Sequence, residues 1–250
     1  MNFLKKIFNW YNIRLVLIFS ILIIVFGFSK QRNDQKNITE IKIELVQKNE
    51  NLLNQSMVNK LLIENFNESK KVEKKVINLN HLEKDLNKHP MIEESNVYLN
   101  VKGELVAKVF DKKPLARILY KNESRYVDKK GDLIPLSKNF SARVPFVSGS
   151  LSMIKKPMFL ELLQSIENDR FFKESITAID INNKNQVYLY QRGHDYLIVF
   201  GQPKDIHLKM SNFKVFYQYN AKNNTINKYK IINLAFTKQV IGSKIEEDEQ

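Results

Sequence analysis

The sequence predicts an α+β protein with a single N-terminal transmembrane helix, a β-α-α-β-β module, and a mixed β domain with about two helices. An uncharged apolar run near the start predicts the transmembrane helix. Alternating apolar positions and helical apolar spacings then predict the order β-α-α-β-β up to about residue 112. Strand-like runs dominate the remainder. Hydrophobic residues make up 43 % of the 250 residues, enough to bury a core, and the mean hydropathy of −0.36 excludes a polytopic membrane protein.

The formal net charge of +13 could attract nucleic acid, anionic lipid headgroups or an anionic wall polymer. The lysines are spread along the whole chain, so we interpret the excess as a compositional property rather than a focused binding surface. The sequence has no cysteine, which excludes disulfides, thiolate zinc sites and cysteine nucleophiles.

Residues 15–29 (LVLIFSILIIVFGFS) carry no charge. Fifteen helical residues rise only about 22 Å, but extension back to Ile7 gives about 35 Å, enough to span a roughly 30 Å hydrocarbon core. Arg14 is then the one charge, close enough to the end to reach the headgroups. We therefore predict an N-terminal tail over 1–12, a bilayer-spanning anchor over 13–29 and a polar linker over 30–37. The short tail before a large C-terminal domain favours the cytoplasmic side for residues 1–12. The predicted anchor residues are Leu15, Val16, Leu17, Ile18, Phe19, Ile21, Leu22, Ile23, Ile24, Val25 and Phe26.

The alternative for this segment is a cleaved signal peptide, with Lys5 and Lys6 as its basic region and residues 27–29 as a weak cleavage site. Phe26 and Phe28 crowd that site, which favours an uncleaved anchor. Basic residues are nearly balanced on the two sides of the span, so the charge count alone does not set its orientation.

The β-α-α-β-β module is predicted over residues 38–112. A half-buried strand at 41–45 precedes a helix whose apolar face runs from Met57 to Phe66, capped by Asn54 or Ser56. Asn80 is the predicted cap of a second helix that ends before Pro90. A hairpin follows, with Gly103 in its turn.

The second domain is predicted over residues 113–241, followed by a disordered acidic tail over 242–250. The predicted elements are a hairpin at 126–134, a strand at 144–149, a helix opened by Pro157, strands at 176–181, 187–190 and 196–200, a further helix, and a long β-prone run at 229–241. Asp205 is the predicted cap of that further helix, which runs through Tyr219 with Ile206, Met210, Phe213 and Tyr217 at helical spacing.

Motifs that follow one another in the same order carry a family resemblance. They are VAKVFDKKPLARI at 106–118, Tyr126-Val127-Asp128 with Gly131, Val144-Pro145 with Gly149, Val199-Phe200-Gly201 with Lys209, and YKIINLAF at 229–236. Their shared order over residues 1–241 resembles the FtsQ/DivIB family of cell-division proteins, and the first module resembles a POTRA (polypeptide-transport-associated) domain. Asn233 and Ala235 depart from the family pattern, in which many members carry an acidic and a basic residue.

The resemblance implies a non-catalytic bitopic scaffold of the bacterial divisome. It implies an N-terminus inside, an extracytoplasmic C-terminal domain, and a place in the inner membrane at the division septum. It also implies partners of the FtsB/FtsL (DivIC) type, a POTRA module that helps recruitment, and a link between divisome assembly and septal peptidoglycan synthesis.

The last β-prone run lies close to the C-terminus, where a sheet often ends in an edge strand that can accept a partner strand. The resemblance implies that the partners add there. The predicted partner-binding residues are Ile231, Ile232, Leu234, Phe236, Thr237 and Val240. Leu234, Phe236 and Val240 would share one face of the strand, although each could equally be a core residue.

No motif for catalysis or cofactor binding is found, and we predict no enzyme, no metal, no cofactor, no nucleic acid and no small-molecule substrate. The four histidines, His81, His89, His194 and His207, are interpreted as surface residues, with His194 in an exposed turn. Aromatic residues among lysines at 209–230 could stack on nucleobases, but an amphipathic helix explains them. An envelope chaperone would need a further POTRA repeat, and a wall enzyme would need a catalytic constellation; neither is visible.

Overall fold

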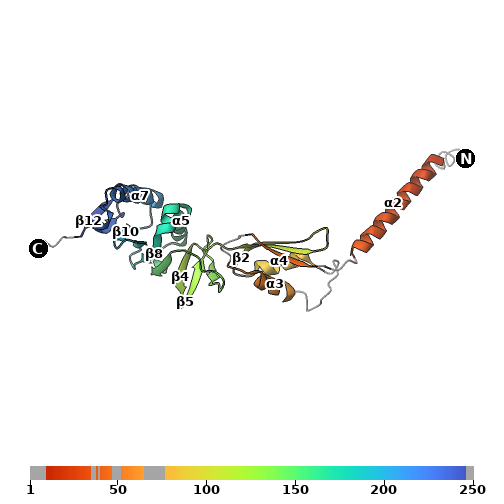
Figure 1. Ribbon diagram of the computed structural model, residues 1–250, viewed down its shortest axis with the longest axis horizontal. Coiled ribbons are helices and arrows are strands. Elements are labelled where there is room, and N and C mark those ends of the chain that lie inside the picture. Colours follow the sequence, from red (N-terminus) through yellow and green to blue (C-terminus); the bar gives the residue numbers. More distant parts are fainter. Residues whose placement is uncertain (1–9, 35–37, 39, 47–51, 65–76, 246–250) are drawn as a thin grey trace. The chain divides into compact units, whose positions relative to one another are not determined.

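The computed structural model describes residues 10–34, 38, 40–46, 52–64 and 77–245, which form two compact units (Figure 1). The first unit contains the N-terminal helix and the described residues up to Phe110, except residues 52 and 53. Those two belong to the second unit, which continues from Asp111. The predictions for residues 1–9, 35–37, Phe66 and 246–250 lie outside the described residues.

Helix α2 runs from Trp10 to Asp34, about 37 Å long. Its stretch Ile13–Arg32 is long and apolar enough to cross a membrane, and none of it is buried in the protein. All eleven predicted anchor residues are more than half exposed, so no protein surface covers them. The helix continues beyond the predicted end at Ser29, since Lys30 and Gln31 are good helix formers and no Gly or Pro follows to stop it.

The first unit has the predicted β-α-α-β-β order. The elements are β1 (Ile41–Leu45), α3 (Gln55–Glu64), α4 (Leu79–Asn87), β2 (Ile92–Leu99) and β3 (Leu105–Asp111). The sheet order is β1-β3-β2, and β1 runs parallel to β3. α3 packs on β1 and α4 on β2, and each helix buries two apolar side chains on its inner face.

The helix caps are partly as predicted. Asn54 caps α3, because its Oδ1 accepts from the N–H of Met57 at 2.7 Å. The prediction of Asn80 as cap of α4 is wrong: Asn78 takes that place and accepts from the N–H of His81 at 3.1 Å. Asn78 has the extended backbone that a cap requires, whereas Asn80 lies inside the helix.

The second unit is built on one nine-stranded sheet in the order β12-β11-β10-β9-β8-β7-β4-β5-β6. Its strands are β4 (Ala116–Tyr120), β5 (Glu123–Val127), β6 (Leu133–Pro135), β7 (Phe146–Gly149), β8 (Ile176–Ile181), β9 (Val187–Gln191), β10 (Leu197–Gly201), β11 (Tyr229–Asn233) and β12 (Ile241–Lys244). The pairs β4–β7, β7–β8 and β10–β11 are parallel, and the other pairs are antiparallel.

Helices α5 (Lys156–Asn168), α6 (Arg170–Ser175) and α7 (Ile206–Lys222) bury their apolar faces in the core of this unit. Short 3-10 helices lie at Leu151–Met153 and Ile226–Lys228. In Figure 1, α5 and α7 lie on the same side of the strands. Pro157 is in the first turn of α5, as predicted, and the predicted α7 positions Ile206, Met210 and Phe213 are buried.

Candidate partner-binding edge

The last β-prone run of the sequence is two strands, not one. β11 ends at Asn233, residues 234–240 leave the sheet, and β12 begins at Ile241. β11 pairs with β10 on one side and with β12 on the other. The prediction that this run is the edge strand is therefore wrong, and β12 forms that edge of the sheet.

Two hydrogen bonds explain the break in the run. The Oδ1 of Asn233 accepts from the N–H of Ala235 at 2.8 Å, an Asx turn that bends the chain. The N–H of Leu234 donates to Val199 O at 2.8 Å, which ties the start of the segment to β10. Residues 242–244 belong to β12, so the predicted disordered tail begins too early in the sequence.

The six predicted partner-binding residues have three different environments. Ile231 and Ile232 lie in β11, half-buried and buried respectively, and Leu234 is buried in the core. Val240 packs partly against the core. Only Phe236 presents a large apolar surface, 52 % exposed.

Thr237 joins the segment 234–240 to helix α7. Its hydroxyl donates to the Asp205 carboxylate at 3.1 Å, and its carbonyl accepts from the Asn212 side-chain amide at 2.9 Å. Asp205 occupies the N-cap position of α7 but makes no side-chain cap hydrogen bond, contrary to the prediction. The carboxylate thus holds the segment 234–240 in place of capping the helix.

Close packing also positions residues 234–240 against the end of β10. Gly201 has a φ of +73°, and a Cβ on it would lie 2.9 Å from the Cβ of Ala235. A glycine at 201 and a small residue at 235 are therefore required together.

Strand β12 is held on β11 by an aromatic cover. Gly242 is paired with Ile232, and a Cβ on Gly242 would lie 2.4 Å from the Tyr229 ring. Phe216 of α7 packs on Tyr229, with ring centroids 5.2 Å apart. The strand therefore needs a glycine at this position to keep its place beneath the rings.

The outer side of β12 pairs with no other strand among the described residues. Ile241 is 41 % exposed, and Ile245 beyond the strand is exposed as well. The opposite edge of the sheet, β6, has three residues and ends in Pro135, which has no N–H to donate. The two edges thus differ in what they offer to an added strand, and β12 offers more.

A family model described as FtsQ/DivIB, C-terminal related, matches residues 113–243, just over half of the chain. The chain belongs to the FtsQ/DivIB family. This family is a non-catalytic scaffold family of cell division, so the chain has a division role with partners in the division complex. Helix α2 fits a membrane-anchored member of the family. No curated protein matches the chain.

Lys209, one of the residues that carried the FtsQ/DivIB resemblance, is buried, with 3 % of its surface exposed. Its ammonium donates to the carbonyls of Phe200 at 3.0 Å and Gln202 at 2.8 Å, and lies 5.0 Å from the centroid of the Phe200 ring. Burial lowers the pKa of Lys209. The side chain closes the turn between β10 and α7, which is a structural role.

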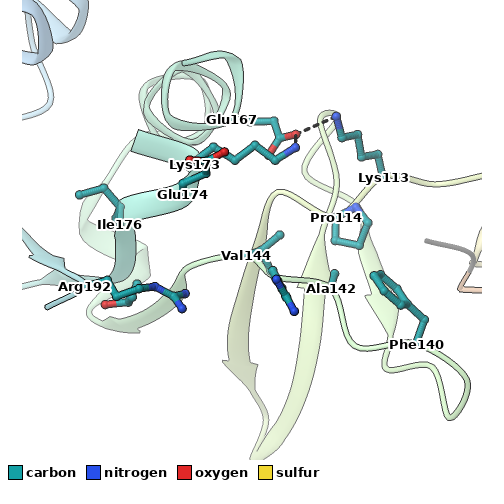
Figure 2. Close-up of a pocket in the computed structure, with 12 residues that line it drawn as sticks. Lys113, Pro114, Phe140, Ala142, Val144, Glu167, Lys173, Glu174, Ile176 and Arg192 are labelled. Atoms are coloured by element: carbon teal, nitrogen blue, oxygen red, sulfur yellow. Dashed lines mark hydrogen bonds and ion pairs between the residues drawn. The ribbon is translucent and has the colours of Figure 1, made fainter. Parts of the chain in front are cut away.

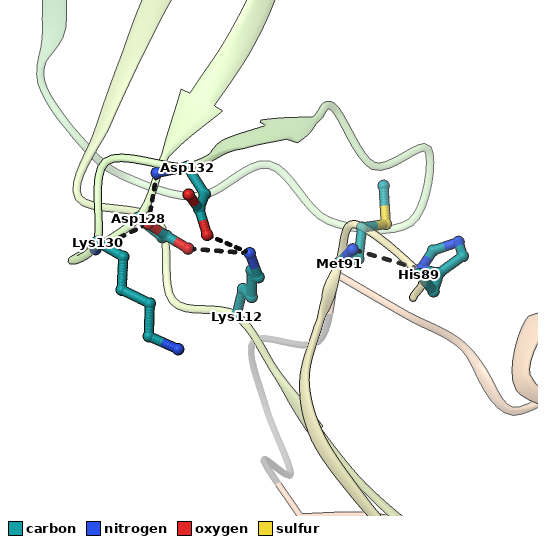
Figure 3. Close-up of polar contacts among 6 residues, drawn as sticks. All are labelled: His89, Met91, Lys112, Asp128, Lys130 and Asp132. Atoms are coloured by element: carbon teal, nitrogen blue, oxygen red, sulfur yellow. Dashed lines mark hydrogen bonds and ion pairs between the residues drawn. The ribbon is translucent and has the colours of Figure 1, made fainter. Parts of the chain in front are cut away.

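Asp128, from the family-like hairpin motif, is also structural (Figure 3). Its Oδ1 accepts from the N–H groups of Lys130 and Asp132, both at 2.8 Å, and Lys112 Nζ lies 3.1 Å from Oδ2. Burial disfavours the ionised carboxyl, but these hydrogen bonds and the lysine hold the pKa of Asp128 below its usual value. The motif therefore orders the turn between β5 and β6.

His194 is not the freely exposed turn residue that the sequence predicts. Its Nδ1 lies 2.8 Å from Asn227 Oδ1, its Nε2 lies 3.2 Å from the Tyr217 hydroxyl, and its ring stacks on Tyr196. The ring joins the turn between β9 and β10 to α7. The two hydrogen-bond partners, Asn227 and Tyr217, are distant in sequence, so no local pattern indicated these bonds. Among the described residues, no cluster of His, Asp or Glu could hold a metal ion.

Proposed function

We propose that this chain is a non-enzymatic, single-pass membrane scaffold of the division machinery that binds a partner of the FtsB/FtsL (DivIC) type by strand addition at β12. The observation that carries the proposal is the position of β12 at the end of the sheet, with its outer side unpaired among the described residues. An unpaired strand presents N–H and C=O groups that a second chain can satisfy. The proposed binding site is therefore Ile241–Lys244 and not the predicted residues 231–240. Phe236, which precedes β12 in the sequence, is proposed as an additional apolar contact.

The remaining parts of the proposal follow the family and the element order. Helix α2 anchors the chain in the bilayer with the N-terminus inside, and the β-α-α-β-β unit acts as a POTRA module in recruitment to the septum. The alternative of an envelope chaperone predicts a repeat of that unit. The second unit instead contains a nine-stranded sheet, which favours the scaffold.

The test uses the full-length chain in detergent micelles and capture of its division partner. Ile241→Asp places a charge on β12, where the side chain is 41 % exposed, and should reduce capture about tenfold or more. Leu133→Asp is the matched control, since Leu133 lies on the opposite edge strand and is 36 % exposed. Equal capture by both variants would contradict a site at β12.

Phe236→Asp separates the strand from its neighbouring segment. A loss of capture with Phe236→Asp but not with Ile241→Asp would place the contact on residues 234–240 instead of on the strand edge. Circular dichroism of each variant checks that the fold is retained.

A further inference from the structure

A pocket of about 560 Å³ lies in the second unit, away from β12 in the strand order (Figure 2). It is formed where three neighbouring parallel strands, β4, β7 and β8, begin. Its lining includes Lys113 and Pro114 before β4, residues 142–144 before β7, and Ile176 and Thr177 at the start of β8. Its volume is in the range of pockets that hold compact ligands, and below what a long peptide segment requires.

The charged side chains of the pocket have a positive balance. Four are cationic, Lys113, Arg143, Lys173 and Arg192, and two are anionic, Glu167 and Glu174. Glu167 is shared by Lys113 and Lys173, each 2.7 Å away, and Glu174 pairs with Arg170, which does not line the pocket. One glutamate thus neutralises only one of the two lysines that it holds.

The two arginines carry positive charge that no carboxylate of the pocket neutralises. Neither Arg143 nor Arg192 has a side-chain hydrogen bond or ion pair within the described part of the chain, and both are exposed to solvent. Arg192 lies across the pocket from the lysines (Figure 2). A guanidinium presents a planar fork of N–H donors that matches phosphate oxygens, and a doubly charged group is the best match for two such arginines.

The uncharged part of the lining is mostly apolar. Pro114, Val144 and Phe140 contribute apolar groups (Figure 2), and Thr177 is its polar member. A ligand that combines an anionic group with an apolar or aromatic portion would satisfy both kinds of lining at once. A bare inorganic anion would leave the apolar portion of the pocket wet.

We propose that this pocket binds a compact phosphate-bearing ligand, with the phosphate on Arg143 and Arg192 and the apolar portion against Pro114, Val144 and Phe140. The phosphate comes from a soluble phosphate ester or from a phospholipid headgroup. The ligand is bound and not transformed. The proposal is independent of β12 and of strand addition.

The test is calorimetric titration of the full-length chain in non-ionic detergent micelles. The probes are phenyl phosphate, inorganic phosphate, benzoate, a tetraglutamate peptide, and dihexanoyl-phosphatidylglycerol below its micelle concentration. Phenyl phosphate or the short phospholipid should bind more tightly than inorganic phosphate, benzoate and the peptide. The tighter of these two probes identifies the source of the phosphate.

Three variants separate this site from general attraction to a basic protein. Arg143→Gln and Arg192→Gln should each weaken binding about tenfold, the loss expected for one charge-assisted hydrogen-bonded contact. Glu167→Gln removes a negative charge and releases both lysines, so it should strengthen binding, a result that misfolding cannot produce. Lys184→Gln/Lys222→Gln is the control, with two cations removed outside the pocket.

The proposal is overturned by no binding of either phosphate ester or by equal weakening in the control variant. Tighter binding of the glutamate peptide would assign the pocket to an acidic protein segment instead. If circular dichroism shows that one arginine variant is unfolded, the binding affinities of the other arginine variant and of Glu167→Gln still test the proposal.

Discussion

Gly201→Ala should loosen the segment 234–240 through a single steric contact, and the chain contains an unusually close control for it. Gly201 and Gly193 have the same φ, +73°, so an alanine at either position carries the same left-handed backbone strain of about 1–3 kcal/mol. They differ in surroundings. A Cβ at 193 meets nothing within 4 Å, whereas a Cβ at 201 lies 2.9 Å from Ala235 Cβ and 3.0 Å from Ala235 Cα.

The difference in stability between Gly201→Ala and Gly193→Ala therefore gives the cost of the steric contact with Ala235 alone. Overpacking of this kind costs about 1–3 kcal/mol, since neither partner is the flexible end of a long side chain. Gly201→Ala should lose that much more local stability than Gly193→Ala. Hydrogen-exchange mass spectrometry of the full chain in micelles measures the loss directly, as faster exchange in residues 229–244.

A compensating change completes the cycle. Ala235→Gly in the Gly201→Ala background removes the Cβ that the new methyl meets but not the Cα at 3.0 Å. It should therefore recover part of the packing cost and none of the backbone strain. Equal losses in Gly201→Ala and Gly193→Ala would refute the steric reasoning. A double variant no more stable than Gly201→Ala would refute it as well.

Three further changes test the packing around the edge and the two motif residues. Gly242→Val should release β12, because the branched side chain would meet the Tyr229 ring that covers this glycine. Hydrogen exchange in β12 should rise and partner capture should fall. The control Ser243→Val, at an exposed neighbouring position, should leave exchange and capture unchanged. Lys209→Met should destabilise the second unit by about 2–4 kcal/mol in urea unfolding, since two carbonyls lose their shared donor. Asp128→Asn should cost about 1–3 kcal/mol at pH 7. The difference in unfolding free energy between the two proteins should narrow as the pH falls below 3.8, the ordinary pKa of Asp. A carboxyl whose pKa is lowered in the folded state stabilises the fold above its unfolded pKa, and this contribution is lost as the folded carboxyl protonates. A constant difference down to pH 2 would show that the charge of Asp128 does not contribute.

Most helices and strands could be predicted from the sequence because each buries one face and therefore has a regular pattern of apolar residues. Alternation predicted β1 and β8 with the observed bounds, and the apolar spacing of α7 predicted its buried residues Ile206, Met210 and Phe213. The positions of Gly103 and Gly131 in turns with positive φ were equally local signals. What the pattern could not supply was the pairing of strands, such as the parallel neighbours β1 and β3, which depends on contacts far apart in the chain.

The sequence predicted one edge strand over residues 229–241, whereas the structure has two strands there and the edge strand is β12. β-prone residues continue from 229 to 241, so propensity predicts one strand, and only a tertiary hydrogen bond from Leu234 to β10 and an Asx turn at Asn233 break it. Ile232 and Leu234 within that run are buried, but aliphatic residues of this kind also occur in edge strands, so their burial could not be read from the sequence. The two arginines that line the pocket lie 49 positions apart in sequence, so no local pattern indicates that they share a pocket.

The strand order of the whole sheet determines its edge, and a partner strand added at β12, as proposed, would leave the core of the second unit undisturbed. A strand at the end of nine contributes few buried side chains, and in β12 none of the four residues is fully buried. Its place depends on one neighbour and on the aromatic cover above Gly242. A partner strand added there would gain backbone hydrogen bonds on a surface already ordered, so little conformational entropy is lost on this side of the interface. The other edge, three residues closed by a proline, lacks that opportunity, and the asymmetry gives strand addition a single direction of growth.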